Sequence, residues 1–446
     1  MTSSQRQSLE NAFVNPSGGR LNRRSFLERS LALGLSSSTT IALLDACGSQ
    51  SSTGSSTQQP VTLKLLHWNK ADYGPAVEEM NRRFHAENPA ITVQYENIPT
   101  DQYETVLKAR LAGGDAPDVF GAHDIKPYAK AGYLMDLSKE AWVPFMYDAA
   151  IASNSYHGKV YALSMNQNVI GVVYNRKIFS DLGLSVPATW DEFLQVCQKI
   201  KSAGIVPLAL GIKDQWVTQL VPYGMTGSAL YPNDPTFDQN VLAGKASFAS
   251  SAWVKIMQDY LDLNKRGFFN QSPLGVTYDQ STQLVALGKA AMIAQGDWVV
   301  PAVKQANPAI NLGMFPSPYV TQAGQKTVVL SGVGPYVAIS AATRHPNEAR
   351  KYVAFCARPD IAALYLKKGG SIPALKNVPG KPDPALTEMQ QYISKGTHVF
   401  PDSNWAPGVQ NVFLKDIQSL FSGTMTVQAM LQEMDKTSEQ NRSQVI

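Results

Sequence analysis

The chain has 446 residues, more than one hydrophobic core usually serves, and this length favours two lobes. Hydrophobic residues make up 44% and charged residues 17%, as in globular proteins, and no apolar run reaches the roughly 18 residues that a membrane-spanning helix needs. The formal net charge is only +4 and the basic residues are scattered, so neither the charge nor its distribution indicates nucleic-acid binding.

The first 46 residues have the pattern of an export signal. Arg23-Arg24 precedes a weakly apolar stretch at residues 31–44, an arrangement that resembles the bacterial twin-arginine signal. Residues 44–47 resemble a lipobox, whose cysteine is lipidated and becomes the first residue, although Asp45 departs from the small residue usual there. We therefore expect a lipoprotein anchored through Cys47. An ordinary signal peptide cleaved nearby, or a cysteine buried in a short helix, is the alternative.

Residues 47–60 form a polar tract rich in Ser, Thr, Gln and Gly, with no side chains to bury. This composition is typical of a flexible tether, and we expect the folded part to begin near Val61. The two other cysteines, Cys197 and Cys356, lie in apolar helical segments. We predict buried thiols rather than a disulfide.

The folded part begins with a strand pattern, because Val61, Leu63 and Leu65 alternate with polar residues. A helix should follow and end before Pro89, after which residues 91–95 resume the alternation. A strand, a helix and a strand in such close succession favour a right-handed crossover in a parallel sheet. A helix at 102–111 and a short buried strand at 118–121 extend this open α/β lobe.

A second α/β unit should begin after the β-rich segments 158–163 and 169–175. Thr189 and Glu192 have the spacing of a capping box at the start of a helix. The pattern further predicts strands at 206–210 and 291–294, a strand-like segment at 328–340, and helices at 251–266, 283–289, 347–357, 362–367, 409–422 and 426–440.

Several short segments carry a family pattern: 66–68, 116–124, 158–163, 172–175, 187–193 and 288–298. In this order they resemble the family-1 extracellular solute-binding proteins, the group that is maltose-binding-protein-like. The resemblance spans residues 61–440. It implies a two-lobed α/β fold of the periplasmic-binding-protein type (type II), with hinge strands and a C-terminal helical segment. The N-terminal lobe would comprise residues 61–168 and 332–378, and the C-terminal lobe residues 169–331 and 379–446.

The same resemblance implies a function. The chain would be a monomeric substrate-binding lipoprotein of an ABC importer, held on the outer face of the cytoplasmic membrane. It would bind a carbohydrate, expected to be an oligosaccharide, in the cleft between lobes that close by hinge bending. Its partners would be the carbohydrate, the ABC permease subunits and the lipid anchor; no enzymatic activity, cofactor or nucleic acid is expected.

Residue by residue, the resemblance places Asp124 where the family has a carboxylate that accepts sugar hydroxyls, preceded by Ala122 and His123. Trp298 falls at a position where an aromatic ring stacks on the sugar. Asn168 replaces an acidic ligand, which puts the same substrate in doubt, and Asn166 belongs to the same run of amides. Helix capping for Asp124, core packing for Trp298 and a hinge turn for the amides are the alternatives. The further candidates are Trp68, Asp72, Gln102, Trp216, Tyr223, Gly332 and Trp405, chosen mainly as aromatics near loops, polar groups at strand ends and a glycine that lets backbone approach ligand.

Two alternative functional interpretations remain. The same fold could bind a non-sugar solute such as a polyamine, a metal chelate or a phosphodiester. A secreted glycoside hydrolase could pair Asp124 with Asp279 or Asp297 as its two carboxylates. The sequence contains no phosphate-binding loop, no nucleophile elbow and no histidine pair with metal-ligand spacing, so no metal site is expected.

Overall fold

The computed structural model describes residues 60–68, 70–122, 124–334, 336–369, 372–381 and 383–444. Residues 59–446 form one compact unit. The predicted export signal, Cys47 and most of the tether lie outside the described residues, as does His123. Among the described helices, none combines the length and the apolar character needed to cross a membrane.

The first sheet has the strand order β2-β1-β3-β12-β6. Its strand β1 pairs in parallel with β2 and β3, whereas β12 runs antiparallel to β3 and β6. The helix α3 connects β1 to β2, so the predicted strand, helix and strand are confirmed. The strands are β1 (Val61–His67), β2 (Ile91–Asn97), β3 (Val119–Ala122), β6 (Ala162–Ser164) and β12 (Tyr336–Ile339).

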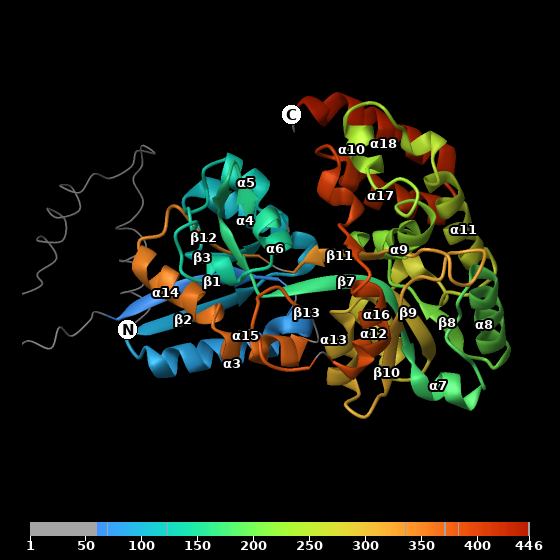
Figure 1. Ribbon diagram of the computed structural model, residues 1–446, viewed down its shortest axis with the longest axis horizontal. Helices are drawn as coiled ribbons and strands as arrows, with labels where there is room; N and C mark the ends of the chain where they lie inside the picture. Colours follow the sequence, from blue (N-terminus) through green and yellow to red (C-terminus); the bar gives the residue numbers. More distant parts are fainter. Residues whose placement is uncertain are drawn as a thin grey trace, which may run out of the picture. The chain divides into compact units, whose positions relative to one another are not determined.

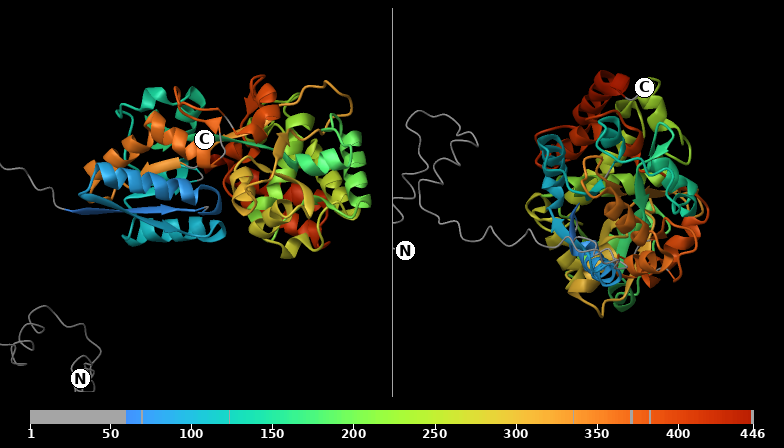
Figure 2. Two further views of the ribbon diagram at one scale, coloured as in Figure 1. Left: turned by 90° about the horizontal axis from the view of Figure 1, so that it is seen from below. Right: turned by 90° about the vertical axis from the view of Figure 1, so that its left-hand side faces the viewer.

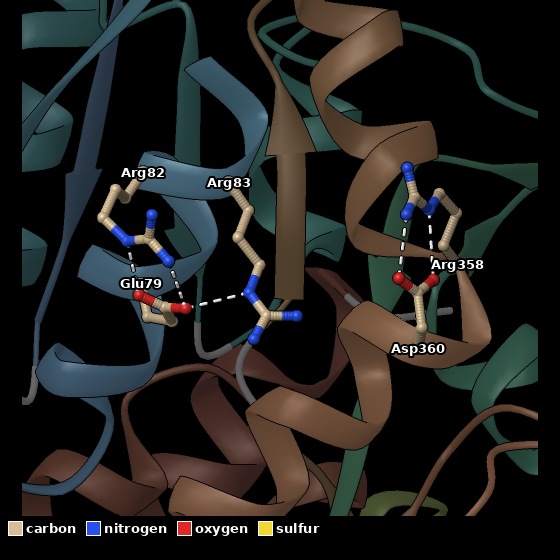
Figure 3. Close-up of polar contacts among 5 residues, drawn as sticks. All are labelled: Glu79, Arg82, Arg83, Arg358 and Asp360. Carbon is tan, nitrogen blue, oxygen red and sulfur yellow. Dashed lines mark hydrogen bonds and ion pairs between the residues drawn. The ribbon is translucent and has the colours of Figure 1, made fainter. Parts of the chain in front are cut away.

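Helices from both ends of the chain cover this sheet. The late helix α15 packs along α3, and Figure 2 shows α3 in blue lying over the blue strands. Arg358 binds both Glu87 at the end of α3 and Asp360. Figure 3 shows the pair of Arg358 with Asp360, and Glu79 accepting hydrogen bonds from Arg82 and Arg83. The elements of this part are α3 (Lys70–Glu87), α4 (Thr100–Gly113), α5 (Lys126–Lys130), η1 (Val143–Phe145), α6 (Asp148–Ser153), β4 (Ser155–Tyr156), β5 (Lys159–Val160), α14 (Pro346–Cys356) and α15 (Pro359–Gly369).

The second sheet has the order β14-β11-β7-β9-β8, with β10 and β13 also paired to β7. In Figure 1, β7 is the long green strand that reaches from β13 into this sheet. The predicted strand-like segment 328–340 is in fact two strands, β11 in the second sheet and β12 in the first. The strands are β7 (Asn166–Asn175), β8 (Val206–Ala209), β9 (Ala290–Gly296), β10 (Leu312–Phe315), β11 (Val329–Val333), β13 (Ile372–Pro373) and β14 (Thr397–His398).

The second sheet carries most of the remaining helices. They are α7 (Arg176–Asp181), α8 (Trp190–Ser202), η2 (Gln215–Gln219), α9 (Leu220–Ala229), α10 (Phe237–Leu242), η3 (Phe248–Ser250), α11 (Trp253–Lys265), η4 (Pro273–Gly275), α12 (Tyr278–Ala286), α13 (Val299–Ala306), η5 (Pro384–Leu386), α16 (Thr387–Ile393), η6 (Pro401–Asn404), α17 (Val409–Phe421), α18 (Val427–Asn441) and η7 (Arg442–Gln444). Separate apolar cores form around the two sheets.

The start of one helix and the cap of another differ from the prediction. The helix expected at 283–289 begins at Tyr278, because Thr277 and Gln280 exchange side-chain and backbone hydrogen bonds in a capping box. At α8 the expected box is half-formed: Thr189 accepts from the Glu192 amide, but the Glu192 carboxylate accepts from the amide of Ala188. Cys197 and Cys356 are free and buried, as predicted, and burial raises the pKa of both thiols.

The C-terminal helix α18 is tied to the second lobe by Asp435. Its carboxylate accepts hydrogen bonds from the amides of Phe248 and Ala249 at 2.7 and 3.1 Å, and from the Ser247 hydroxyl at 2.6 Å. Replacing Asp435 with Ala should lower the free energy of unfolding by about 2–3 kcal/mol in urea denaturation, because hydrogen bonds to a charge are lost.

The exposed ion pair between Lys177 and Asp181 supplies the matched control. An Asp181→Ala variant should change stability by less than about 0.5 kcal/mol. Equal effects of the two substitutions would contradict the anchoring role of Asp435.

Candidate functional site

The strand β7 follows β6 of the first sheet after a single residue and pairs with β11, β13, β9 and β10 in the second sheet. Gln167 pairs with Val333 of β11 and Ile372 of β13, and residues 170–174 pair with β9. At Val169 the backbone is held twice by Asp297: Val169 donates to the carboxylate at 3.0 Å and accepts from the Asp297 amide at 3.0 Å. Asp297 is fully buried. This contact fixes the turn after β9 against the crossing strand.

The predicted run of amides lies at the start of β7 and is largely buried. Asn166 is 0% exposed and Asn168 is 7% exposed, and the Asn166 amide donates to Asn168 Oδ1 at 2.9 Å. A Cβ atom at Gly334 would lie 2.3 Å from Asn166 Nδ2, so the glycine makes room for this side chain. The amides therefore bond to each other where the strand crosses between the sheets.

Trp298 follows β9 and is half-buried, and it packs against the cores around both sheets. A Cβ atom at Gly296 would lie 2.0 Å from its ring, so the glycine lets the indole fold back over the strand end. Trp216 in η2, also half-buried, lies 6.4 Å from Trp298 and 4.9 Å from Tyr278, measured between ring centroids. The fold thus brings together Trp216 and Trp298, two of the predicted site residues.

At the end of the first sheet, Asp124 is exposed, and its Oδ1 accepts the Lys126 amide at 3.0 Å. The carboxylate thus stabilises a local turn and keeps acceptor capacity for another donor. Ala122 is buried at the end of β3 and pairs with Tyr336, and Gln102 is exposed on α4. Asp72 lies in α3, but its side chain is outside the described part of the structure.

Trp68 is buried, at 6% exposure, which corrects the expectation of an exposed aromatic ring. Its indole stacks on His67 at 4.5 Å and lies 4.8 Å from Tyr103. The absence of a side chain at Gly121 opens the space for this ring, because a Cβ atom there would approach it to 2.6 Å. The Trp68 side chain is therefore part of the packed core at the strand ends.

Trp405 is likewise in the core, with 8% of its surface exposed, and Tyr223 is buried there with 1% exposed. The Trp405 ring packs against Tyr223, Phe248, Trp253 and Phe413, and its Nε1 donates to Asp238 at 3.0 Å. The expectation that these aromatics face solvent is wrong, because a buried hydrogen-bond partner satisfies the indole. Gly332 also has a packing role: the Phe400 ring lies 2.3 Å from where its Cβ atom would be.

The structure adds Asp402 in η6, which no sequence motif marks. It is half-buried, and its Oδ2 accepts from Gln410 Nε2 at 2.8 Å. Burial raises the pKa of Asp402 to about 6, and the nearby charges of Asp238 and Asp124 act in the same direction. Burial also raises the pKa of Tyr336, with contributions from Asp124 and Asp402. Asp124, after the first-sheet strand β3, and Asp402, in η6, thus both raise the pKa of the Tyr336 hydroxyl.

Carboxylates, half-buried indoles and amide groups suit a ligand with many hydroxyls and an apolar face. In the part of the chain that the structure describes, no cluster of three or more His, Cys, Asp and Glu side chains could hold a metal ion.

Comparison with known proteins identifies the family. Residues 67–363 match the model of the bacterial extracellular solute-binding proteins, and the chain belongs to this family. The multiple sugar-binding protein of Streptococcus mutans is 28% identical over 406 residues, covering 86% of this chain and 93% of that protein. The predicted family and two-lobed α/β fold are confirmed.

Solved structures agree. The solute-binding protein RafE, solved in complex with raffinose, has a TM-score of 0.70 and 26% identity, covering 84% of this chain and 98% of its own. A chitin oligosaccharide binding protein has the same fold, with a TM-score of 0.74 and 24% identity over 86% of this chain and 99% of its own. The family and these relatives are named as binding proteins, not enzymes, and the family is an exported one.

The core role of Trp405 can be tested by replacing it with Phe. The variant should lose about 1–3 kcal/mol of unfolding free energy, because buried Asp238 loses a hydrogen-bond donor. Trp142→Phe is the matched control, since the Trp142 Nε1 atom is buried with no hydrogen-bond partner among the described residues. Chemical denaturation of both variants should show the larger loss for Trp405→Phe; a larger loss at Trp142 would contradict the assignment.

Proposed function

We propose that this protein is the extracytoplasmic receptor of an ABC importer, that it binds an oligosaccharide between its two lobes, and that it catalyses no reaction. The relatives support the substrate class, because the curated relative is named for multiple sugars and the solved one holds raffinose. The residues at the strand ends support it independently of the relatives.

The observation that carries the proposal is the position of Trp298. Its ring packs against the cores of both lobes, remains half-buried and lies beside the half-buried Trp216. Sugar rings present flat C–H faces, which aromatic rings contact favourably. A ligand stacked on Trp298 would gain contacts from both lobes at once and would favour the closed arrangement.

Asp124 supplies the polar half of the proposed site. It is exposed and only partly engaged by the Lys126 amide, so it can accept sugar hydroxyls, and Gln102 is a further exposed polar group of the same lobe. His123 and Asp72 remain proposed contacts. The burial of Asn166, Asn168, Trp68 and Trp405 favours a supporting role for them, behind the ligand-contacting groups.

The hydrolase alternative gains no support from Asp297. Its carboxylate is fully buried and accepts the Val169 amide. A general acid or nucleophile must reach the glycosidic bond, whereas Asp297 holds the backbone of the crossing strand. We therefore propose binding without catalysis.

Delivery and anchoring belong to the same proposal. The ligand-closed monomer would dock on ABC permease subunits, and other subunits would hydrolyse ATP. A lipid on Cys47, followed by the polar tract to residue 60, would keep the receptor near the membrane.

A panel of raffinose, maltotriose, chitotriose, spermidine and glycerol 3-phosphate should identify the ligand class. Thermal denaturation of residues 60–446 should show a higher melting temperature with at least one saccharide, because the ligand binds only the folded state. Chromatography should recover that saccharide intact. Cleaved sugar would favour the hydrolase, and stabilisation by a charged compound alone would exclude a sugar receptor.

Replacing Asp124 with Ala should weaken the binding of that saccharide more than tenfold in titration calorimetry, because hydrogen bonds to a charge contribute about 1.5–3 kcal/mol. Asp148→Ala is the control, since its carboxylate lies on the same lobe and is fully exposed. Unchanged affinity in the Asp124 variant, with the melting temperature preserved, would contradict the assignment of Asp124.

Replacing Cys47 with Ala should release the exported protein from the membrane, because the lipid is attached to this thiol. Fractionation of cells that express the full chain should move the protein from the membrane pellet to the soluble extracytoplasmic fraction. Retention in the membrane would contradict the lipobox assignment.

A further inference from the structure

Residues 397–405 form a strap that attaches to the strands between the lobes. Its first residues, β14, pair in parallel with β11, with Thr397 opposite Val329 and His398 opposite Leu330. The Phe400 ring fills the space beside Gly332 on the same strand. Because β11 also pairs with the crossing part of β7, the strap is fixed to the structure that joins the two lobes.

The two ends of the strap are anchored in the second lobe. The His398 ring stacks on Tyr231, 3.8 Å between centroids, and its Nε2 lies 3.0 Å from the Pro235 carbonyl oxygen. At the other end, Trp405 donates to Asp238, which also accepts from the Tyr231 hydroxyl at 2.7 Å. These contacts hold the residues between them in a defined position.

Asp402 lies between these anchors. Gln410 of α17 donates to its Oδ2 and also to Gln219 Oε1, at 2.8 and 3.1 Å. An ionised carboxylate can accept about four hydrogen bonds. Asp402 is half-buried, so it retains capacity for a donor from outside the protein.

Asp402 is joined to the element that carries Trp216, because Gln410 bridges its carboxylate to Gln219 of η2. Electrostatic interactions link it to Asp124, which follows β3, and to the Tyr336 phenol of β12. Like charges brought together in a partly buried space repel. A ligand whose hydroxyl hydrogens lie between the carboxylates would offset this repulsion and would hold the lobes together.

We infer that Asp402 is a ligand-binding residue of the second lobe, the counterpart of Asp124 across the site, and that sugar affinity depends on its ionisation. The inference rests on the proposed function and deepens it. A neutral or cationic saccharide would be accepted, whereas an anionic one would meet two carboxylates. Gln410 is a positioning residue for Asp402.

The expected pH dependence follows from the charges around the strap. The groups that act on Asp402 are Tyr223 from α9, Tyr231 two residues after that helix, Asp238 from α10, and Asp124 and Tyr336 from the first lobe. Because burial raises the pKa of Asp402 to about 6, the carboxylate is ionised above pH 6 and becomes protonated below it. Hydroxyl binding to the carboxylate should be present above this pH and lost below it.

Burial raises the pKa of Asp238 to about 6 as well, while the charge of His398 acts in the opposite direction and lowers it. It is only 1% exposed, and its oxygens accept from Tyr231 and Trp405. Asp238 is therefore closed to the ligand and can only influence Asp402 through its charge, which makes it the matched control.

The test uses residues 60–446 and whichever of raffinose, maltotriose or chitotriose binds best at pH 7.5. Between pH 7.5 and 5, wild-type affinity should fall about tenfold, since about one-tenth of a carboxyl group with pKa 6 is ionised at pH 5. Asp402→Asn should bind about tenfold more weakly at pH 7.5, with less than about twofold further change at pH 5.

Asp238→Asn should keep a pH transition and move its midpoint lower, because a like charge near Asp402 is removed. His398→Gln should keep the transition, which separates histidine titration from that of Asp402. Calorimetry at pH 6 in two buffers should show proton release on binding in the wild type and none in Asp402→Asn.

Melting temperatures confirm that each variant is folded. Sugar binding with the same pH profile in Asp402→Asn and wild type would overturn this inference and leave the proposed function intact. If no saccharide binds the wild type, the proposed function and this inference both fail.

Discussion

The strand β7 is the constraint on which the rest of the structure depends. Its first residues pair with β11 and β13, and its later residues pair with β9 and β10, so one continuous strand serves the hinge region and the second sheet. A buried amide pair and the two-way contact between Val169 and Asp297 supply hydrogen bonds between polar groups at this crossing. The turn after β9, which carries Trp298, is therefore placed by the same contacts that hold the crossing strand.

Glycines allow bulky groups to meet at this crossing. Gly296, Gly332 and Gly334 leave space for Trp298, Phe400 and Asn166, and a Cβ atom at each would come within 2.3 Å of the neighbouring side chain. The constraint is steric, because real Cβ atoms do not approach so closely. As a result the aromatic ring of the proposed site, the strap and the hinge amides are packed into one connected region. A ligand that moves any of them would act on the relation between the lobes.

Much of the fold could be predicted from local patterns. The alternation at 61–65 and 91–95, the buried thiols and the order of the family segments required no long-range information. The local pattern does not show the break between β11 and β12, because residues 328–340 keep a strand-like composition while their partners lie in different sheets. Only the family resemblance implies a change of lobe at residue 332. In the site, Trp216 and Trp298 are both predicted from the sequence, and the structure brings their rings into contact. The hydrogen bond that accompanies the burial of Trp405 is accepted by Asp238, which is distant in the chain, and Asp402 stands in the short helix η6, whose composition marks only a turn.

The central claim is that a saccharide binds between the lobes, with its ring on Trp298 and its hydroxyls on Asp124. The most direct measurement is a crystal structure of residues 60–446 grown with the saccharide that most raises the melting temperature. Our account predicts an intact sugar stacked on Trp298, with hydroxyl groups within hydrogen-bond distance of the Asp124 carboxylate, about 2.5–3.0 Å. A saccharide bound elsewhere on the protein, or one that contacts neither residue, would contradict it.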